Sequence, residues 1–577
     1  MATFYDIFII AVCAVLLLTA ALIIRSAFSR GGGETGGWEL RGAWRRLRAV
    51  ARVTISEALR MKIAVIFILL LVVTLPVLCL AARGDGTLRG QVQMFLGYSL
   101  GLTSFYLSLL TMFFSSRTLA HEIATQQIHM LATKPIPRWQ IVLGKWLGIM
   151  TLNALLVAFA VLFTYGGTRW IVGRFERQLR DELVLRGGLT GEQADDCIDA
   201  IRQVRGPGGK GAASPIIPAL ASALGRSDEQ VIDLLLRLPE STRMDIRRLD
   251  ELRRQVLVAR ASVRPALPPL QAEIDEQYKL LKEQNRLPSG EEWPIERIRE
   301  NLRAVVAARY TTVAPLDRRQ WVMKGPVPRE DDEFLLSVRF RIRTGGYTPE
   351  IALPDGRKLA ENTFVPEWIV GDPAGPKAYS PPIRPEYVDR FLEFEVPTNV
   401  IEPDGTIRVT MINRDPRRVD AVVQLEDGLE VLYRVGSFEE NLCTAGAAIL
   451  IPLALLAALG LAMSTFCTFP VAVLVCLVVF GICQTSGLIA ESLSMTAWQA
   501  PLWHTTRESL RKLATETMFE IVSLGDISPS ERVLDGRAIR LADLARESVN
   551  VVLLRAGLLL LAGVMVFRRR ELAAVIV

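Results

Sequence analysis

The sequence predicts a polytopic α-helical membrane protein with about seven transmembrane helices and a large α+β insert on the extracytoplasmic side. Half of the residues are hydrophobic and 22% are charged. The charged residues are nearly absent from several windows of about 20 residues, the length that crosses a bilayer. Lysine and arginine gather beside these windows at every second loop, the pattern that fixes orientation in a membrane. A long polar interval between two groups of windows forms the insert.

Seven apolar segments are long enough to span: residues 7–24, 63–82, 92–114, 146–168, 442–463, 469–490 and 549–567. Backbone groups inside lipid must find hydrogen-bond partners within their own segment, so these segments are expected to be helices. Arginines follow the first segment and none precedes it, which is opposite to the polarity of a signal peptide. We therefore expect an uncleaved anchor whose N-terminus lies outside.

Three basic stretches are expected in the cytoplasm: residues 26–62, residues 115–145 and the tail that starts at Arg568. The segments expected outside are then 83–91, 169–441 and 491–548, and residues 464–468 are expected to form a tight turn on the cytoplasmic side. Arg555 falls inside the last span, where it either snorkels to the outer surface or lines an interior path. Since the net charge of +6 comes from clusters beside spans, it indicates membrane orientation and no nucleic-acid partner.

These assignments divide the chain into six parts: an N-terminal transmembrane anchor (1–28), a cytoplasmic interfacial helix (38–61), three spans with a cytoplasmic coupling loop at 115–145 (62–168), an extracytoplasmic helical region (169–314), a β-sandwich (315–437), and three spans with an extracytoplasmic loop at 491–548 (438–577).

The segment 41–60 is amphipathic. Trp44, Leu47, Ala51, Ile55 and Leu59 recur at spacings of three and four, and arginines fill much of the remainder. This pattern is typical of a helix that lies along the inner leaflet with its arginines near anionic headgroups. The alternative is a surface helix of a small cytoplasmic domain, for which little chain is available.

The second cytoplasmic segment covers residues 117–148. Residues 117–132 are expected to form a short helix, which the sequence Lys-Pro-Ile-Pro-Arg at 134–138 stops because proline lacks an amide hydrogen. A new helix then enters the membrane through Gly144 and Lys145. A short helix held between two spans is suited to transmit a force from a cytoplasmic partner into the membrane.

This arrangement resembles the permease subunits of type-2 ABC transporters. A helix carrying Glu122 precedes K-P-I-P-R and then G-K at the next span, and the earlier amphipathic segment ends E-A-L-R immediately before a span. The resemblance implies an interfacial helix, six spans, and a coupling helix that docks on a separate ATPase; residues 7–24 would be an additional helix. It implies the following ATPase-coupling residues: Arg117, Glu122, Lys134, Pro135, Arg138 and Lys145. The sequence departs from the family pattern at 124–126, where relatives often have a basic residue and a Gly-Thr pair.

Two glycine pairs are candidates for helix packing. Gly97 and Gly101 lie inside the third span, and Gly144 and Gly148 lie at the start of the fourth. Small residues four apart let two helix backbones approach closely.

No catalytic, metal or cofactor site is expected in this chain. The glycine-rich run 206–211 lacks a Ser or Thr after Lys210 and is expected outside, so it is no phosphate loop. The three histidines have no cysteine or second histidine at metal-ligand spacing. Any ATPase activity is therefore assigned to a partner subunit.

The insert changes pattern along its length. Its first part is helical, with Thr190 as an expected helix N-cap and with another helix that begins at Ser227-Asp228-Glu229. Residues 241–285 and 294–309 are expected to pair as a helical hairpin around the proline-rich turn at 265–269.

From about residue 315 apolar and polar residues alternate, as in 335–342, 391–397 and 406–412. Residues 426–429 are expected to join two strands as a tight hairpin. Short half-buried strands with such turns indicate a β-sandwich. Its aromatics Trp321, Trp368 and Tyr379 either pack in the core or stack on a carbohydrate.

The functional expectation is a permease subunit in the cytoplasmic (inner) membrane of a bacterium. It would work with a second membrane subunit, identical or different, and two copies of an ABC ATPase, coupling ATP hydrolysis to substrate export or mechanical work. The alternative is a membrane-anchored sensor or assembly protein whose sandwich binds a carbohydrate or another envelope ligand. That alternative needs an output domain, and the sequence encodes none.

Overall fold

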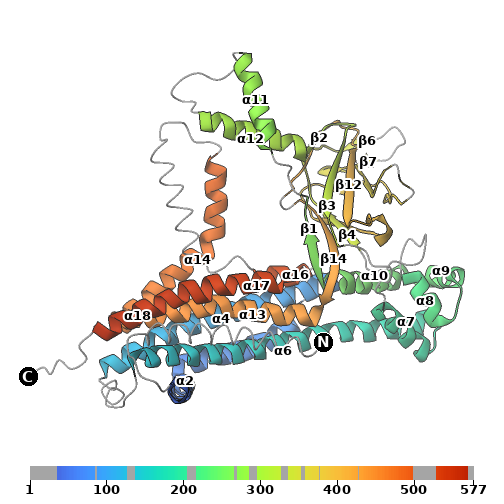
Figure 1. The fold of residues 1–577 in the computed structure, drawn as a ribbon. Helices are drawn as coiled ribbons and strands as arrows, with labels where there is room; N and C mark the ends of the chain where they lie inside the picture. Colours follow the sequence, from blue (N-terminus) through green and yellow to red (C-terminus); the bar gives the residue numbers. More distant parts are fainter. Residues whose placement is uncertain are drawn as a thin grey trace, which may run out of the picture. The chain divides into compact units, whose positions relative to one another are not determined.

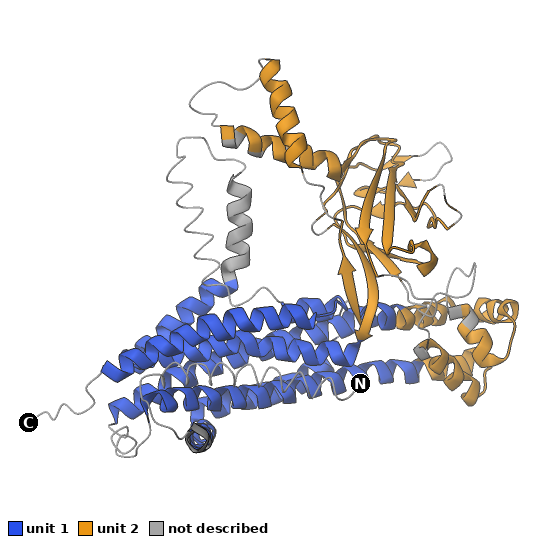
Figure 2. Cartoon of the chain, viewed as in Figure 1, with its two compact units in different colours: residues 1–178, 251–257, 437–577 blue, residues 179–250, 258–436 orange. Residues whose placement is uncertain are grey.

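A computed structural model describes residues 36–82, 84, 87–125, 137–203, 216–265, 270–284, 295–326, 336–352, 358–373, 375, 377–425, 428–497 and 528–569 (Figure 1). The chain divides into two compact units (Figure 2). The membrane unit comprises residues 1–178, 251–257 and 437–577, and the insert unit comprises residues 179–250 and 258–436. The predicted anchor at 7–24 lies outside the described residues.

The membrane unit consists of helices. They are α2 (Gly36–Arg60), α3 (Lys62–Ala81), α4 (Leu88–Ala124), α6 (Arg138–Gly187), α13 (Phe438–Ser464), α14 (Phe469–Ala497), α16 (Pro529–Leu534), α17 (Leu541–Glu547), the π-helix η2 (Ser548–Ala556) and α18 (Gly557–Arg569). By length and composition, five helical stretches in the described part can cross a membrane: α3, α4, α6, α13 and Leu541–Arg569. A shorter apolar stretch, Phe469–Gln484, belongs to α14. The prediction of several long apolar helices is confirmed.

One predicted helix boundary is wrong. Residues 117–124 continue the span helix α4, so they are no separate short helix. The stretch from Leu102 to Ala124 contains neither glycine nor proline, and nothing in it interrupts the helical hydrogen bonds. The rest of the predicted short helix lies outside the described residues. Helix α6 continues beyond its apolar stretch and ends at Gly187, before Gly188 with its positive φ of 62°.

Helix α13 is the centre of the membrane unit, and most of its residues are buried. Its glycines permit close contact with neighbouring helices. A Cβ atom at Gly460 would lie 1.9 Å from Ser115 Oγ of α4, and one at Gly446 would lie 2.7 Å from Val161 Cγ2 of α6. Trp146 of α6 also donates a hydrogen bond to the Ala454 carbonyl at 3.0 Å. Apolar packing and close backbone approach, which hold helices together in lipid, therefore converge on α13.

The last transmembrane stretch contains the π-helix η2. Arg555 lies in this segment, is half-buried, and interacts electrostatically with Cys483 of α14. Its neighbour is thus a side chain of another helix in the bundle.

The insert unit begins with helices: residues 179–187 are the end of α6. The helices that follow are α7 (Gly191–Gln203), α8 (Ile216–Leu224), α9 (Asp228–Arg237), α10 (Glu240–Gln255), α11 (Gln271–Glu283) and α12 (Ile295–Thr311). Residues 251–255 at the end of α10 belong to the membrane unit. The expected N-cap at Thr190 and the expected helix start at Ser227 are confirmed, since Thr190 bonds with Gln193 and Ser227 with Gln230 in reciprocal capping boxes.

The predicted pairing of 241–285 with 294–309 is confirmed only for α11 and α12, and residues 266–269 of the expected proline-rich turn lie outside the described residues. Residues Val258–Val263 form a strand, β1, which separates α10 from α11. The pairing partner of α11 is α12, through a small core that includes Ile274 and Val306. The β-branched residues of β1 favour a sheet. Pairing with tertiary partners therefore gives this segment an extended conformation, although the sequences on either side favour helices.

The strands that follow are β2 (Thr312–Val313), β3 (Arg318–Lys324), β4 (Leu336–Phe340), β5 (Ile342–Thr344), β6 (Ile351–Ala352), β7 (Lys358–Leu359), β8 (Thr363–Phe364), β9 (Pro366–Val370), β10 (Glu386–Tyr387), β11 (Leu392–Val396), β12 (Thr406–Asn413), β13 (Ala421–Val423) and β14 (Leu429–Ser437), with a short 3₁₀ turn at Thr398–Val400. In the described part they form a four-stranded sheet in the order β1-β14-β4-β11, two three-stranded sheets, β3-β12-β9 and β2-β13-β5, and two short pairs.

The three larger sheets share one hydrophobic core. Val338 of β4 lies opposite both Val431 of β14 and Phe394 of β11, in antiparallel register. Trp321 and Trp368 are 5% and 3% exposed and belong to this core. For both tryptophans, core packing is confirmed and sugar stacking is excluded. The predicted hairpin at 426–429 is wrong because β13 and β14 belong to different sheets.

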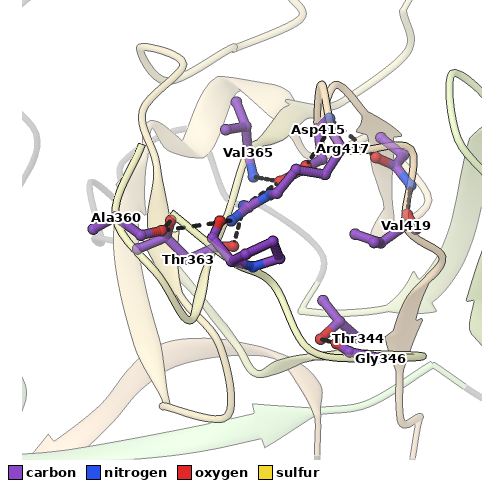
Figure 3. Close-up of polar contacts among 10 residues, drawn as sticks. Thr344, Gly346, Ala360, Thr363, Val365, Asp415, Arg417 and Val419 are labelled. Atoms are coloured by element: carbon purple, nitrogen blue, oxygen red, sulfur yellow. Dashed lines mark hydrogen bonds and ion pairs between the residues drawn. The ribbon is translucent and has the colours of Figure 1, made fainter. Parts of the chain in front are cut away.

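A buried ion pair links loops of the insert unit to one another (Figure 3). Arg417 and Asp415 are 5% and 0% exposed, with Nη2 and Oδ2 2.7 Å apart. Arg417 also donates to the carbonyl oxygens of Pro349, at 3.1 Å, and Thr363. Asp415 accepts a hydrogen bond from the Val365 amide at 3.2 Å. One pair of charges thereby links three segments that are distant in sequence.

We expect Arg417→Met to lower the stability of the insert unit by about 3 kcal/mol, because it leaves the buried Asp415 carboxylate without a counter-charge. Thermal unfolding of the full chain and amide hydrogen exchange at 363–365 would measure the loss. The matched control is Lys358→Met, whose ion pair with Glu350 is exposed and contributes about 0–1 kcal/mol. Equal losses in the two variants would contradict this account.

Candidate functional site

A cluster of three charged side chains joins α2, α4 and α6 where α4 ends. Lys145 Nζ lies 2.8 Å from Glu122 Oε1 and 3.9 Å from Glu57 Oε2. The side chains of Lys145, Glu122 and Glu57 are 3%, 12% and 27% exposed. Each helix contributes one of these residues, which we call the Lys145 cluster. Residues 126–136, which connect the two helices that supply Glu122 and Lys145, lie outside the described residues.

The electrostatics of the Lys145 cluster are set by burial. Burial raises the pKa of Glu57 above its usual value and nearby Glu122 raises it further, while Lys145 acts in the opposite direction. The second oxygen of Glu122, Oε2, is buried and has no hydrogen-bond partner among the described residues. Lys145 is therefore the cation that lets two carboxylates remain close together away from water.

The glycines at the start of α6 lie against α2. A Cβ atom at Gly144 would lie 2.8 Å from Val50 Cβ, and one at Gly148 would lie 2.8 Å from Thr54 Cβ and 2.9 Å from the Ala51 carbonyl oxygen. Real Cβ atoms do not approach this closely, so these two positions set the distance between α2 and α6.

The other predicted glycine pair behaves differently. A Cβ atom at Gly97 would lie 3.0 Å from Leu534 Cδ1 of α16, whereas one at Gly101 would meet nothing within 4 Å. Gln93 of the same helix donates a hydrogen bond to the Leu534 carbonyl at 3.0 Å. This part of α4 therefore packs on the short helix α16.

Arg138, the first residue of α6, binds the end of the last helix. Its Nη1 donates hydrogen bonds to the carbonyl oxygens of Phe567, at 2.8 Å, and Arg568, at 2.9 Å. Its guanidinium also lies 5.7 Å from the centre of the Phe567 ring. A cation at the carboxyl end of a helix satisfies carbonyl groups that have no partner within the helix.

The predicted coupling residues thus fall into separate places. Glu122 and Lys145 pair with each other, Arg138 binds α18, and Arg117 lines a cavity on another side of α4. Lys134 and Pro135 lie outside the described residues. Glu57 was missed, although the sequence offered one signal: it is the acid of E-A-L-R at the end of an arginine-rich helix. Within the described residues, no group of His, Cys, Asp or Glu could hold a metal ion.

The long apolar helices and the amphipathic helix ahead of them define a multi-pass membrane protein. Residues 5–190 match the family model described as ABC-2 family transporter protein, so this chain carries an ABC-2 membrane domain. The match confirms the resemblance seen in the sequence. No curated protein matches the chain, and no solved structure does.

We expect Gly148→Ala to destabilise the contact between α2 and α6, because the added methyl group requires a shift of the α2 backbone at Ala51. Thermal unfolding of the full chain and protease cleavage within α2 would report the change, at a cost of about 1–3 kcal/mol.

Gly101→Ala is the matched control, since open space surrounds that position and alanine favours a helix over glycine by about 1 kcal/mol. If Gly101→Ala destabilised the protein as much as Gly148→Ala, the packing role of Gly148 would be disproved.

Proposed function

We propose that this chain is the permease subunit of an ABC transporter, driven by a separate ATPase that docks at the cytoplasmic loop between α4 and α6. The observation that carries this proposal is the Lys145 cluster in an ABC-2 membrane domain. The cluster links α4 and α6, the two helices that flank the loop, to the interfacial helix α2. A force applied at the loop would therefore act on three helices together.

In this proposal Glu122 and Lys145 are positioning residues. Lys145 is 3% exposed and Glu122 is 12% exposed, so little of either side chain is available to an ATPase. Docking contacts would come from the loop itself, and the pair would fix where the loop begins and ends.

Arg138 extends the same connection to the carboxyl-terminal spans. It begins α6 and binds the last carbonyl groups of α18. Because α18 also packs on α13 through Gly563, whose added Cβ would lie 3.0 Å from Ala462 Cα, movement at the loop would reach the central helix by this route.

The proposed orientation follows the basic loops. The loop between α4 and α6 lies in the cytoplasm, the insert unit lies outside the inner membrane of a bacterium, and its sheets form a β-sandwich. The chain itself is not catalytic; two ATPase subunits and a second membrane subunit complete the transporter, which exports a substrate or performs mechanical work.

Charge reversal tests the positioning role. We expect Glu122→Lys and Lys145→Glu each to destabilise the protein by about 3 kcal/mol, because each places like charges in a buried site. Each should reduce the amount of ABC ATPase that co-purifies with the tagged full chain after cross-linking in native membranes. The double variant restores opposite charges and should recover both stability and co-purification in large part.

The control is Glu439→Lys, which reverses one charge of the exposed pair with Arg169 and should leave both readouts near wild type. If the double variant recovered stability but not the ATPase, Glu122 or Lys145 would be a direct docking contact. If no ABC ATPase co-purified with the wild-type chain, the permease proposal itself would fail.

A further inference from the structure

A cavity of about 450 Å³ lies between the end of α4 and the turn that joins α13 to α14. Arg117 and His121 of α4 line one side of this cavity, and Phe466, Cys467 and Phe469 line another. All of these residues belong to the membrane unit. The cavity is within the size range of pockets that bind small ligands, roughly 300–1,000 Å³.

The cavity is positively charged. The Arg117 guanidinium forms no hydrogen bond or ion pair with the rest of the described chain, and no acidic side chain lines the cavity. His121 lies one helical turn beyond Arg117 on the same wall. An arginine without a counter-charge beside a cavity is suited to bind a phosphate or carboxylate group.

The first turn of α14 adds to this positive potential. Phe469 and Pro470 line the cavity, and the first bond of this helix that the structure shows is from the Ala472 amide to the Thr468 carbonyl. Amide groups ahead of Ala472 therefore have no acceptor inside the helix. The amino end of a helix attracts anions through such amides and through its dipole.

The surface beside the cavity is apolar. Phe466, Val471 and Leu474 are 52%, 46% and 60% exposed, and α14 is one of the apolar helices of the membrane unit. In a bilayer this surface would face acyl chains. A ligand that carries a phosphate group and hydrocarbon chains would match both the cavity and its border.

We infer that this cavity binds the phosphate of an anionic phospholipid. Arg117 and the amino end of α14 hold the phosphate, and the acyl chains lie along Val471 and Leu474. The leaflet follows from the orientation proposed above and would be the inner one, but the binding itself does not depend on an ATPase. A carboxylate of a partner protein would satisfy Arg117 equally, but it would leave the exposed apolar border uncovered.

The test uses the purified full chain in detergent. Phosphatidylglycerol, phosphatidylcholine or inorganic phosphate is added, and bound lipid is counted by native mass spectrometry while thermal unfolding is followed. Phosphatidylglycerol is expected to raise the unfolding temperature more than phosphatidylcholine, and inorganic phosphate is expected to have little effect. Arg117→Gln should weaken retention of phosphatidylglycerol about fivefold, the loss expected for one juxtamembrane cation.

Two further variants make the result specific. Arg117→Lys keeps the charge and should retain most of the binding, which also shows that position 117 tolerates change. Arg48→Gln removes an exposed arginine of α2 and should leave the specifically retained lipid in place.

Equal losses in Arg117→Gln and Arg48→Gln would overturn the site in favour of diffuse surface attraction. An effect of inorganic phosphate as large as that of the lipid would overturn the lipid assignment. Unchanged lipid retention in Arg117→Gln together with loss of a co-purified ATPase would show that the cavity receives a protein carboxylate.

Discussion

The way in which α2, α4 and α6 meet depends on one ammonium group. Lys145 is almost fully buried, and two carboxylates from two other helices surround it. An isolated ammonium ion would be very costly to bury, and so would two adjacent carboxylates. The Lys145 ammonium group and the two carboxylates each need the other to be stable at this site. For this reason α2, α4 and α6 have to meet at this point. The glycines at 144 and 148 then allow α2 to approach closely enough for Glu57 to reach the lysine.

Away from this cluster, close packing between helix surfaces holds the membrane unit together. Water is absent from the bilayer core, so burial of apolar side chains gives helices little reason to associate there, and close contact between small residues becomes the main attraction. Gly446 and Gly460 of α13 and Gly563 of α18 provide such contacts around one central helix. The insert unit is organised differently, with one apolar core shared by three sheets and a buried ion pair that fastens its loops.

Features that depend on local periodicity could be predicted from the sequence. The apolar spans, the amphipathic helix and the alternation in β4 and β12 each follow from side-chain spacing, and the helix caps at Thr190 and Ser227 follow from local hydrogen bonding. Features that depend on distant partners could not. Strand β1 arises inside a helical region because β14 is available to pair with it.

The same limit applies to the site. The motif drew attention to Glu122, Lys145 and Arg138, but their partners are set by tertiary structure. Nothing in the spacing of residues shows that Glu57 completes the cluster, because it lies 88 residues before Lys145 along the chain. Nor could Arg138 be assigned to the end of α18, since its acceptors are backbone carbonyl groups, which every residue carries.

The contact between Arg138 and α18 has a consequence for biosynthesis. Its acceptors are the carbonyl groups of Phe567 and Arg568, which follow Arg138 by 429 and 430 residues along the chain. Earlier helices can be inserted while translation continues, but this arginine finds its acceptors only after α18 has been made. The start of α6 therefore stays unattached to α18 until every described helix between them has left the ribosome.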